Sequence, residues 1–114
     1  MIGAMQIETH PLYAPGQLVR HRRHSYRGVV ADFDMTCQAE ETWYYENRTQ
    51  PPRNQPWYHV LVDGTGTMTY AAQSNLEADD SDDPVEHPLI PELFESFANG
   101  RYERNEVRIQ SWPI

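Results

Sequence analysis

The 114-residue chain contains no lysine and a single cysteine, Cys37. One cysteine excludes an intrachain disulfide and is typical of a protein from a reducing compartment. No apolar run approaches the ~20 residues of a transmembrane helix. The first residues also lack the basic start and the apolar stretch of a secretory signal. We therefore expect a cytoplasmic protein that does not insert into a membrane.

Sequence signatures of catalysis are missing as well. The chain has no Ser/His/Asp pattern, no phosphate-binding loop and no HExxH motif. The acidic pairs Glu40–Glu41 and Asp79–Asp80 are adjacent in sequence, which does not make them paired acid/base sites. We therefore expect a non-enzymatic protein with no catalytic residue and no cofactor.

Metal-binding patterns are equally weak. The histidines His21, His24 and His59 are irregularly spaced, and Cys37 has no partner cysteine, unlike the ligands of zinc sites. The acidic run "EADDSDD" lacks the mid-loop glycine of a calcium loop, and a twelve-residue frame from Asp79 ends at Ile90 instead of glutamate. We expect no metal site and interpret the acidic run as a solvated linker, with a docking segment for a basic partner as the alternative.

The net charge of −8 arises from that same acidic region. Residues 77–95 contain eight acids and no arginine. Residues 1–76 contain six arginines and seven acids, and residues 96–114 contain three arginines and two acids. Because local charges decide contacts within a Debye length of ~8 Å, the acidic total does not exclude a basic binding surface.

Arginine and histidine gather in one short stretch of "GQLVRHRRHSYRGVVAD" (16–32), and we call its members the basic patch: Arg20, His21, Arg22, Arg23, His24, Tyr26 and Arg27. Guanidinium groups are suited to phosphate, so we predict that the patch binds DNA, with Tyr26 stacking nearby. Four phosphate contacts would give a log–log salt slope of about −3.6. The alternative is a solvated turn whose arginines pair with acids such as Asp32 or Asp34.

Short segments rich in β-branched and aromatic residues predict strands over 17–21, 26–34 and 57–63. Alternation along the third segment puts Tyr58, Val60 and Val62 on one face and Trp57, His59 and Leu61 on the other. The turn at Asp63-Gly64 predicts a hairpin over 57–71. A last short strand or turn follows in "SNLEADD".

The segment between the second and third strands predicts a long insertion. "AEETWYYENR" is compatible with a short helix, whereas "TQPPRNQP" contains three prolines that exclude regular structure. Its aromatic residues and the tryptophan that follows are candidates for a partner-binding surface, since Trp and Tyr are enriched at interface hot spots: Trp43, Tyr44, Tyr45 and Trp57. We expect Trp57 or Tyr58 in the core and Trp43 or Tyr45 more exposed.

Helical spacing of apolar residues predicts a final helix over 90–97, on Ile90, Leu93, Phe94 and Phe97. Pro91 fits the first turn of that helix, and Asn99-Gly100 fits its end. The residues that follow are compatible either with a frayed tail or with an added strand.

The expected fold is mainly β: a small SH3-like β-barrel with a long insertion after the second strand and a short C-terminal helix. The expected division of the chain is a lead-in (1–14), a barrel core (15–78), an acidic linker (79–87), a helix packed on the barrel (88–100) and a tail (101–114).

Three stretches together resemble the YccV-like, or HspQ, family, also called the hemimethylated DNA-binding domain: "PGQLVRHRRHSYRGVVADFD", "QPWYHVLVDGTGTMTYAAQSNLE" and, in one branch, "EHPLIPELFESFANGRYER". The resemblance spans Tyr13 to Arg101. One departure is Ser25, where the family usually has glycine, so the turn that carries the basic patch is open to reshaping.

The resemblance implies a bacterial, cytoplasmic, non-enzymatic protein associated with heat shock. Two functions follow from it. The first is binding of double-stranded, hemimethylated DNA. The second is an adaptor role, in which the chain modulates degradation of client proteins by a Lon- or Clp-type ATP-dependent protease. The sequence does not decide whether the chain forms a homo-oligomer. It also does not decide whether the acidic residues of 77–95, which we call the acidic block, cover the basic patch.

Overall fold

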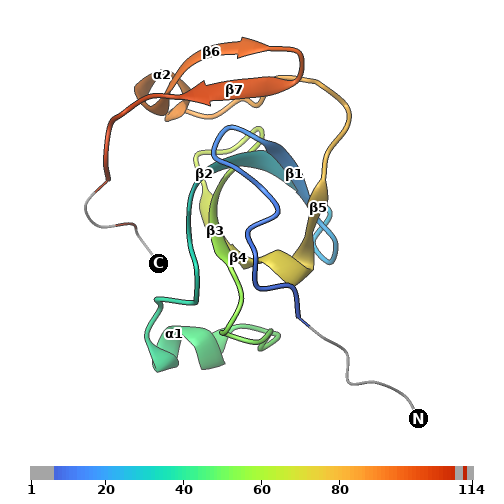
Figure 1. The fold of residues 1–114 in the computed structure, drawn as a ribbon, viewed down its shortest axis with the longest axis vertical. Coiled ribbons are helices and arrows are strands. Elements are labelled where there is room, and N and C mark those ends of the chain that lie inside the picture. Colours follow the sequence, from blue (N-terminus) through green and yellow to red (C-terminus); the bar gives the residue numbers. More distant parts are fainter. Residues whose placement is uncertain (1–6, 110–111, 113–114) are drawn as a thin grey trace.

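A strongly curved antiparallel sheet forms the centre of the computed structural model, which describes residues 7–109 and Trp112. Its five strands have the order β4-β3-β2-β1-β5. They curl around a common interior (Figure 1). The strands are β1 (Leu18–His21), β2 (Arg27–Asp34), β3 (Trp57–Val62), β4 (Met68–Ala72) and β5 (Leu76–Ala78), with a short 3-10 turn, η1 (Gln73–Asn75), before β5. The predicted mainly β, SH3-like fold is thereby confirmed.

Both faces of this sheet are buried, and alternate residues divide between two hydrophobic clusters. Tyr58 and Val60 of β3 belong to a cluster completed by Val19, Val30, Ala71 and Leu76. Leu61 belongs to a second cluster with Leu18, Val29 and Ala31. All six residues of β3 are buried, which is why this segment reads as a nearly continuous apolar run.

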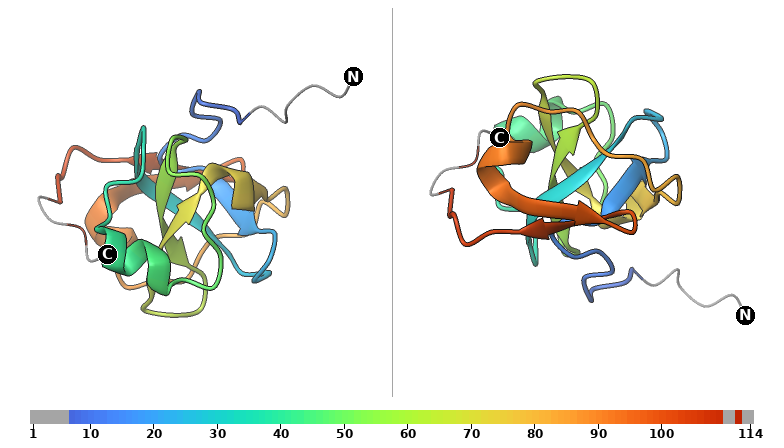
Figure 2. Two further views of the ribbon diagram at one scale, coloured as in Figure 1. Left: turned by 90° about the horizontal axis from the view of Figure 1, so that it is seen from below. Right: turned by 90° about the horizontal axis from the view of Figure 1, so that it is seen from above.

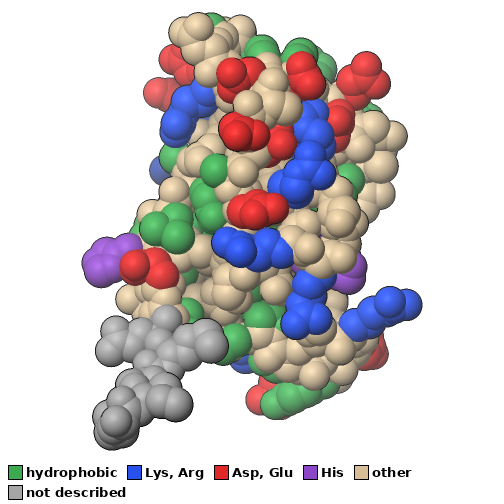
Figure 3. Space-filling model, turned by 90° about the vertical axis from the view of Figure 1, so that its right-hand side faces the viewer, with side chains coloured by type: hydrophobic (Ala, Val, Ile, Leu, Met, Phe, Trp, Pro, Cys, Tyr) green, Lys and Arg blue, Asp and Glu red, His purple; other side chains and the backbone are tan. Residues whose placement is uncertain are grey.

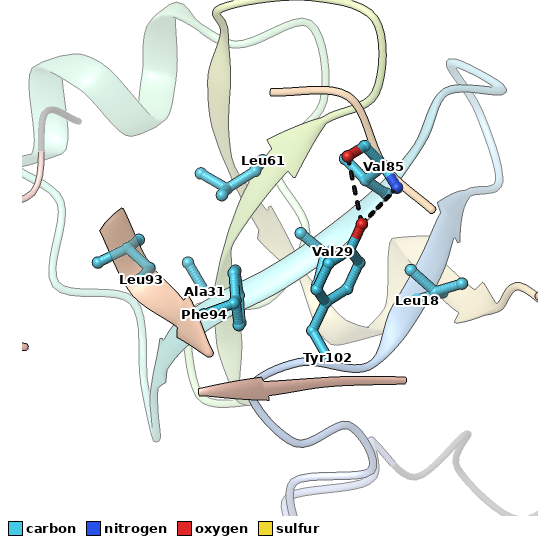
Figure 4. Packing of buried hydrophobic residues seen from close by; sticks show 8 residues of the cluster. All are labelled: Leu18, Val29, Ala31, Leu61, Val85, Leu93, Phe94 and Tyr102. Atoms are coloured by element: carbon cyan, nitrogen blue, oxygen red, sulfur yellow. Dashed lines mark hydrogen bonds between the residues drawn. The ribbon is translucent and has the colours of Figure 1, made fainter. Parts of the chain in front are cut away.

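A separate hairpin covers the second cluster. It consists of β6 (Phe94–Ala98) and β7 (Arg101–Arg104), preceded by the one-turn helix α2 (Ile90–Leu93). Val85, Leu93, Phe94 and Tyr102 pack from this side onto the sheet (Figure 4). The hairpin and α1 (Glu41–Glu46) lie at opposite ends of the molecule (Figures 1 and 2).

The prediction of a helix over 90–97 is wrong beyond Leu93. Pro91 does occupy the first turn of α2, but the chain becomes a strand at Phe94. Asn99 and Gly100 both have positive φ, 54° and 73°. That is the geometry of the two-residue turn that joins paired strands, so Asn-Gly here marks a hairpin. The residues after it form the added strand β7, which was one of the two expected alternatives.

Backbone contacts fix the hairpin against the sheet. The Tyr102 N–H donates to the Gly16 carbonyl at 2.9 Å, and the Arg104 guanidinium donates to the Ala31 carbonyl at 2.9 Å. The Tyr102 hydroxyl accepts from the Val85 N–H at 2.8 Å. Gly16 has φ +93°, and a Cβ there would clash with the Tyr102 carbonyl. Glycine is therefore required where the hairpin meets the sheet.

The N-terminal segment packs on the barrel over its described part. Gln73 accepts from the Leu12 N–H at 2.9 Å and donates to the His10 carbonyl at 2.9 Å. The Tyr13 ring packs edge-on against Tyr58, with centroids 5.5 Å apart. Parts of the predicted lead-in and tail, residues 1–6, 110–111 and 113–114, lie outside the described residues. No helix in the described part of the chain is both long enough and apolar enough to cross a membrane.

Candidate functional site

The turn between β1 and β2 carries most of the basic patch, and His21 organises it. The imidazole is only 5% exposed. Its Nδ1 accepts the N–H groups of Arg23 and His24 at 3.1 and 3.0 Å, and its ring stacks on His24 at 4.5 Å. Burial, together with the nearby charges of His24 and Arg23, lowers the pKa of His21 to about 4. A neutral His21 can accept both bonds at neutral pH, so this residue shapes the turn.

The depressed pKa of His21 predicts a pH dependence of stability. Between pH 6.5 and pH 4 the unfolded chain takes up a proton at this ring that the folded chain does not. The free energy of unfolding should therefore fall over that window, by about 2 kcal/mol after allowance for solvent screening at the turn. His21→Asn keeps an acceptor for the two N–H groups but does not titrate. Urea denaturation at pH 7 and pH 4.5 should show a smaller loss for this variant, and an equal loss in both proteins would contradict the assignment.

Ser25 adopts the backbone conformation that glycine favours. Its φ is 59°, in the left-handed region, and its N–H donates to the His21 carbonyl at 2.9 Å. The serine therefore keeps a turn that glycine would form without strain, instead of reshaping it.

Ser25→Gly should raise the free energy of unfolding by about 0.5–1 kcal/mol, because relief of the left-handed strain exceeds the added flexibility of the unfolded chain. Thermal denaturation measures this effect. Ser74→Gly, at an exposed position where φ is not positive, is the comparison variant and should not stabilise. A lower melting temperature for Ser25→Gly would show that the serine side chain supports the turn.

Arg27 is held inside the protein's own acidic region. Its guanidinium binds Asp63 at 2.8 Å and Asp79 at 3.1 Å, and it also donates to the carbonyl groups of Asp83 and Pro84. The side chain of Arg27 is 16% exposed and that of Asp79 only 4%. Arg27 therefore anchors the acidic segment that follows β5.

Asp79 also reaches Arg20, with Oδ1 3.5 Å from a guanidinium nitrogen. Arg20 and Arg27 lie directly opposite each other on β1 and β2, and β5 flanks β1. Burial alone would raise the pKa of Asp79, but the Ser81 and Arg27 hydrogen bonds and the arginine charges hold it below its usual value. The carboxylate thus bridges two like charges that would otherwise repel each other.

The acidic block therefore does lie over one end of the basic patch. The acids that pair with its arginines are Asp79 and Asp63, not Asp32 or Asp34, because β5 and the turn after β3 bring them to the start of β2. On the upper part of the face that carries β1 and β5, acidic side chains are interspersed among the arginine side chains (Figure 3).

The other end of the patch is open. Arg22, Arg23 and His24 are exposed, and Arg22 donates from Nε to the Leu76 carbonyl at 3.1 Å, which fixes its direction. Within residues 7–109 and Trp112, neither Arg22 nor Arg23 makes an ion pair with an acid. Tyr26 is half-buried, and its hydroxyl lies 2.7 Å from Oγ1 of Thr69 on β4.

A groove of about 480 Å³ joins this turn to the insertion. Its residues come from the basic turn (His21, His24, Tyr26), from α1 and the loop after it (Trp43, Asn47, Arg48, Thr49, Pro51), and from the sheet and η1 (Trp57, Met68, Thr69, Tyr70, Ala71, Ala72, Asn75). Two predicted sites, the basic patch and the aromatic insertion, thus border one concave surface. The parts of it that sequence reasoning missed are Arg48, Thr69 and Tyr70, which carry no motif.

The predicted aromatic surface divides between core and exterior. Trp57 and Tyr44 are buried, and Tyr58 is completely buried, so both core candidates lie in the core. Trp43 is half-buried and packs edge-on against Trp57 and Tyr70, with ring centroids 6.2 and 5.8 Å away. Tyr45 is 68% exposed on the outer side of α1.

His59 is a packed core histidine. It is 2% exposed, and its ring stacks on Tyr70 and on Trp112 at 4.6 and 4.4 Å. Its Nε2 lies 3.5 Å from Asp34, which also accepts the Tyr70 hydroxyl at 2.7 Å. Burial lowers the pKa of His59, although Asp34 and Asp32 act in the opposite direction.

The histidines do not converge on a shared site. His21 stacks with His24 in the turn, whereas His59 is in the middle of β3. Among residues 7–109 and Trp112, no group of three or more His, Cys, Asp or Glu side chains is arranged to hold a metal ion.

These features define a small SH3-like β-protein with an exposed basic turn beside an aromatic groove. Residues 11–101 match the family described as "Hemimethylated DNA-binding protein YccV like". The chain belongs to this YccV-like family, which confirms the resemblance read from the sequence.

Three curated relatives carry the same domain within much longer proteins. F-box only protein 21 of Homo sapiens, of Pongo abelii and of Mus musculus is in each case 31% identical over 96 residues. The match covers 82% of this chain and 15% of each relative. The chain therefore spans about one seventh of the length of these relatives, and the bacterial setting implied by the resemblance stays a prediction.

Proposed function

We propose that this chain is a DNA-binding module that contacts phosphates through Arg22 and Arg23 of the basic turn and through Arg48 across the groove. One observation supports the proposal: His24, at the exposed end of the basic patch, lines a concave surface that has no carboxylate among its lining residues. Basic side chains beside a groove that no acid lines favour a polyanion even on a chain of net charge −8. The family description supports the same partner.

The proposed interface is smaller than the whole basic patch. Arg20 and Arg27 are neutralised by Asp79 and Asp63, so they are not counted as phosphate contacts. Arg22, Arg23 and Arg48 remain. Three phosphate contacts give a log–log salt slope of about −2.7 on duplex DNA, compared with about −3.6 for four. Binding should therefore be measurable at low salt and weak at high salt.

A preference for hemimethylated DNA is part of the proposal. A single methyl group in the major groove is recognised by an apolar contact at the base edge. The groove offers such surface in Trp43, Tyr26 and Met68, and Arg48 is also among its lining residues.

Titration of hemimethylated, fully methylated and unmethylated duplexes of one sequence tests this proposal. At 20–50 mM salt, all three should bind, and the hemimethylated duplex should bind about fivefold more tightly, an apolar-contact effect of about 1 kcal/mol. Equal affinities would remove the methylation preference. No binding to any duplex at low salt would remove DNA as the partner.

An adaptor role is the second candidate, because Tyr45 is largely exposed on α1 and Asp80, Asp82 and Asp83 form an exposed acidic stretch. Aromatic and charged surfaces on separate elements suit a protein that contacts a protease and a client at once. Degradation of candidate clients by Lon- and Clp-type proteases, with and without the chain, tests this role. Faster degradation that Tyr45→Ala abolishes would support it, whereas unchanged rates across the panel would count against it.

A further inference from the structure

The groove beside the basic turn has a composition that points to a flat, uncharged or anionic ligand. Four aromatic rings line it, from Tyr26, Trp43, Trp57 and Tyr70, and Arg48 is its one guanidinium. No aspartate or glutamate is among its lining residues. A cationic ligand such as a methylated amine would therefore meet positive charge without a counterion, even though aromatic rings alone would attract it.

The size and geometry of the groove suit a single planar ring system. Its volume of about 480 Å³ lies within the ~300–1,000 Å³ range of small-ligand pockets. Trp43 and Tyr26 are half-buried, so each keeps some ring surface accessible. Thr69 and Asn75 add polar atoms that can bond to the edge of an inserted ring.

We propose that the groove takes up one unpaired nucleobase of a bound DNA strand, which stacks on Trp43 while Arg22, Arg23 and Arg48 hold the adjoining phosphates. A base that has left the duplex stack is recognised by aromatic stacking and by hydrogen bonds to its edge. Arg48 lines one side of the groove, and the other side is formed by His21, His24 and Tyr26 of the turn that also carries Arg22 and Arg23. This proposal rests on the proposed DNA-binding function and names the subsite that this function would use.

Three labelled duplexes of one sequence test the proposal with the unmodified protein. The first is fully paired, the second carries one extra unpaired thymine, and the third carries an abasic residue at that same extra position. The thymine-bulge and abasic-bulge duplexes have the same backbone and charge, so the missing base is their only difference. Stacking of one base on an aromatic side chain predicts about fivefold or more tighter binding of the thymine bulge than of the abasic bulge.

Two variants locate the effect. Trp43→Ala should abolish the difference between the thymine and abasic bulges. Tyr45→Ala is the matched control, because this aromatic residue lies on the same helix but outside the groove and should preserve the difference. The wild-type comparison stands by itself if Trp43→Ala does not fold.

The possible results distinguish failure of the base-binding groove from failure of the DNA-binding function. Tighter binding of the thymine bulge that Trp43→Ala removes would support the base-binding groove. Equal binding of both bulges, with normal binding of the paired duplex, would overturn the groove proposal and leave the DNA-binding function standing. Failure of all three duplexes to bind at low salt would overturn both.

Discussion

Replacing Arg27 with methionine should lower the free energy of unfolding by about 3 kcal/mol. The guanidinium neutralises Asp63 and Asp79 and bonds the carbonyl groups of Asp83 and Pro84, so its removal leaves several groups without partners. Asp79 is affected most, because its side chain is almost fully buried and its remaining ion pair, with Arg20, has the longer distance of 3.5 Å. Breaking one side of a buried ion pair costs more than the pair itself contributes, since the other charge stays desolvated.

Urea denaturation at pH 7 measures this loss. Arg23→Met is the matched control, because Arg23 is exposed in the neighbouring turn and makes no side-chain ion pair among the described residues. Its stability should change by less than about 0.5 kcal/mol. DNA affinity should show the reverse pattern, with Arg27→Met near wild type and Arg23→Met weakened. A stable Arg27→Met protein that has lost DNA binding would contradict our assignment of Arg27 as a structural residue.

Replacing Arg22 and Arg23 together with glutamine should weaken DNA binding by about 60-fold at 0.1 M salt. Each phosphate contact contributes about a factor of eight at that concentration, relative to 1 M salt, through the release of condensed counterions. The double variant should fold normally because both side chains are exposed.

Arg101→Gln combined with Arg108→Gln is the charge-matched control for the double variant. Both residues are exposed, and both lie in the C-terminal region beyond the basic patch. The control carries the same change in net charge and should weaken binding by no more than about threefold through long-range attraction. Equal loss of affinity in the two double variants would show that net charge, and not the turn, governs binding.

The central sheet could be predicted because its strands carry local signals. The segment 57–62 is apolar except for His59 and is followed by Asp63-Gly64, and the structure places β3 and the start of its hairpin there. The final hairpin could not be predicted in the same way. Ile90, Leu93, Phe94 and Phe97 fit a helical period, but a short apolar run does not separate helix from strand. The Asn99-Gly100 turn and the burial of Phe94 and Tyr102 against the sheet favour a hairpin over a helix in this segment.

The composition of the site depends on pairings between residues far apart in sequence. Arg27 lies 36 residues from Asp63 and 52 from Asp79, so a count of nearby charges points instead to Asp32 and Asp34. The basic patch could be found from the sequence, but its division into a neutralised end and an open end could not. The groove likewise combines the turn with Arg48 and Thr69, which only the folded sheet brings together.

The dependence of DNA affinity on salt concentration measures how many phosphates the chain contacts. We predict a log–log slope of about −2.7 for the wild-type chain on a hemimethylated duplex, from contacts by Arg22, Arg23 and Arg48. The variant lacking Arg22 and Arg23 should then have a slope of about −0.9. The same slope for both proteins, or no binding by the wild-type chain at low salt, would contradict the account.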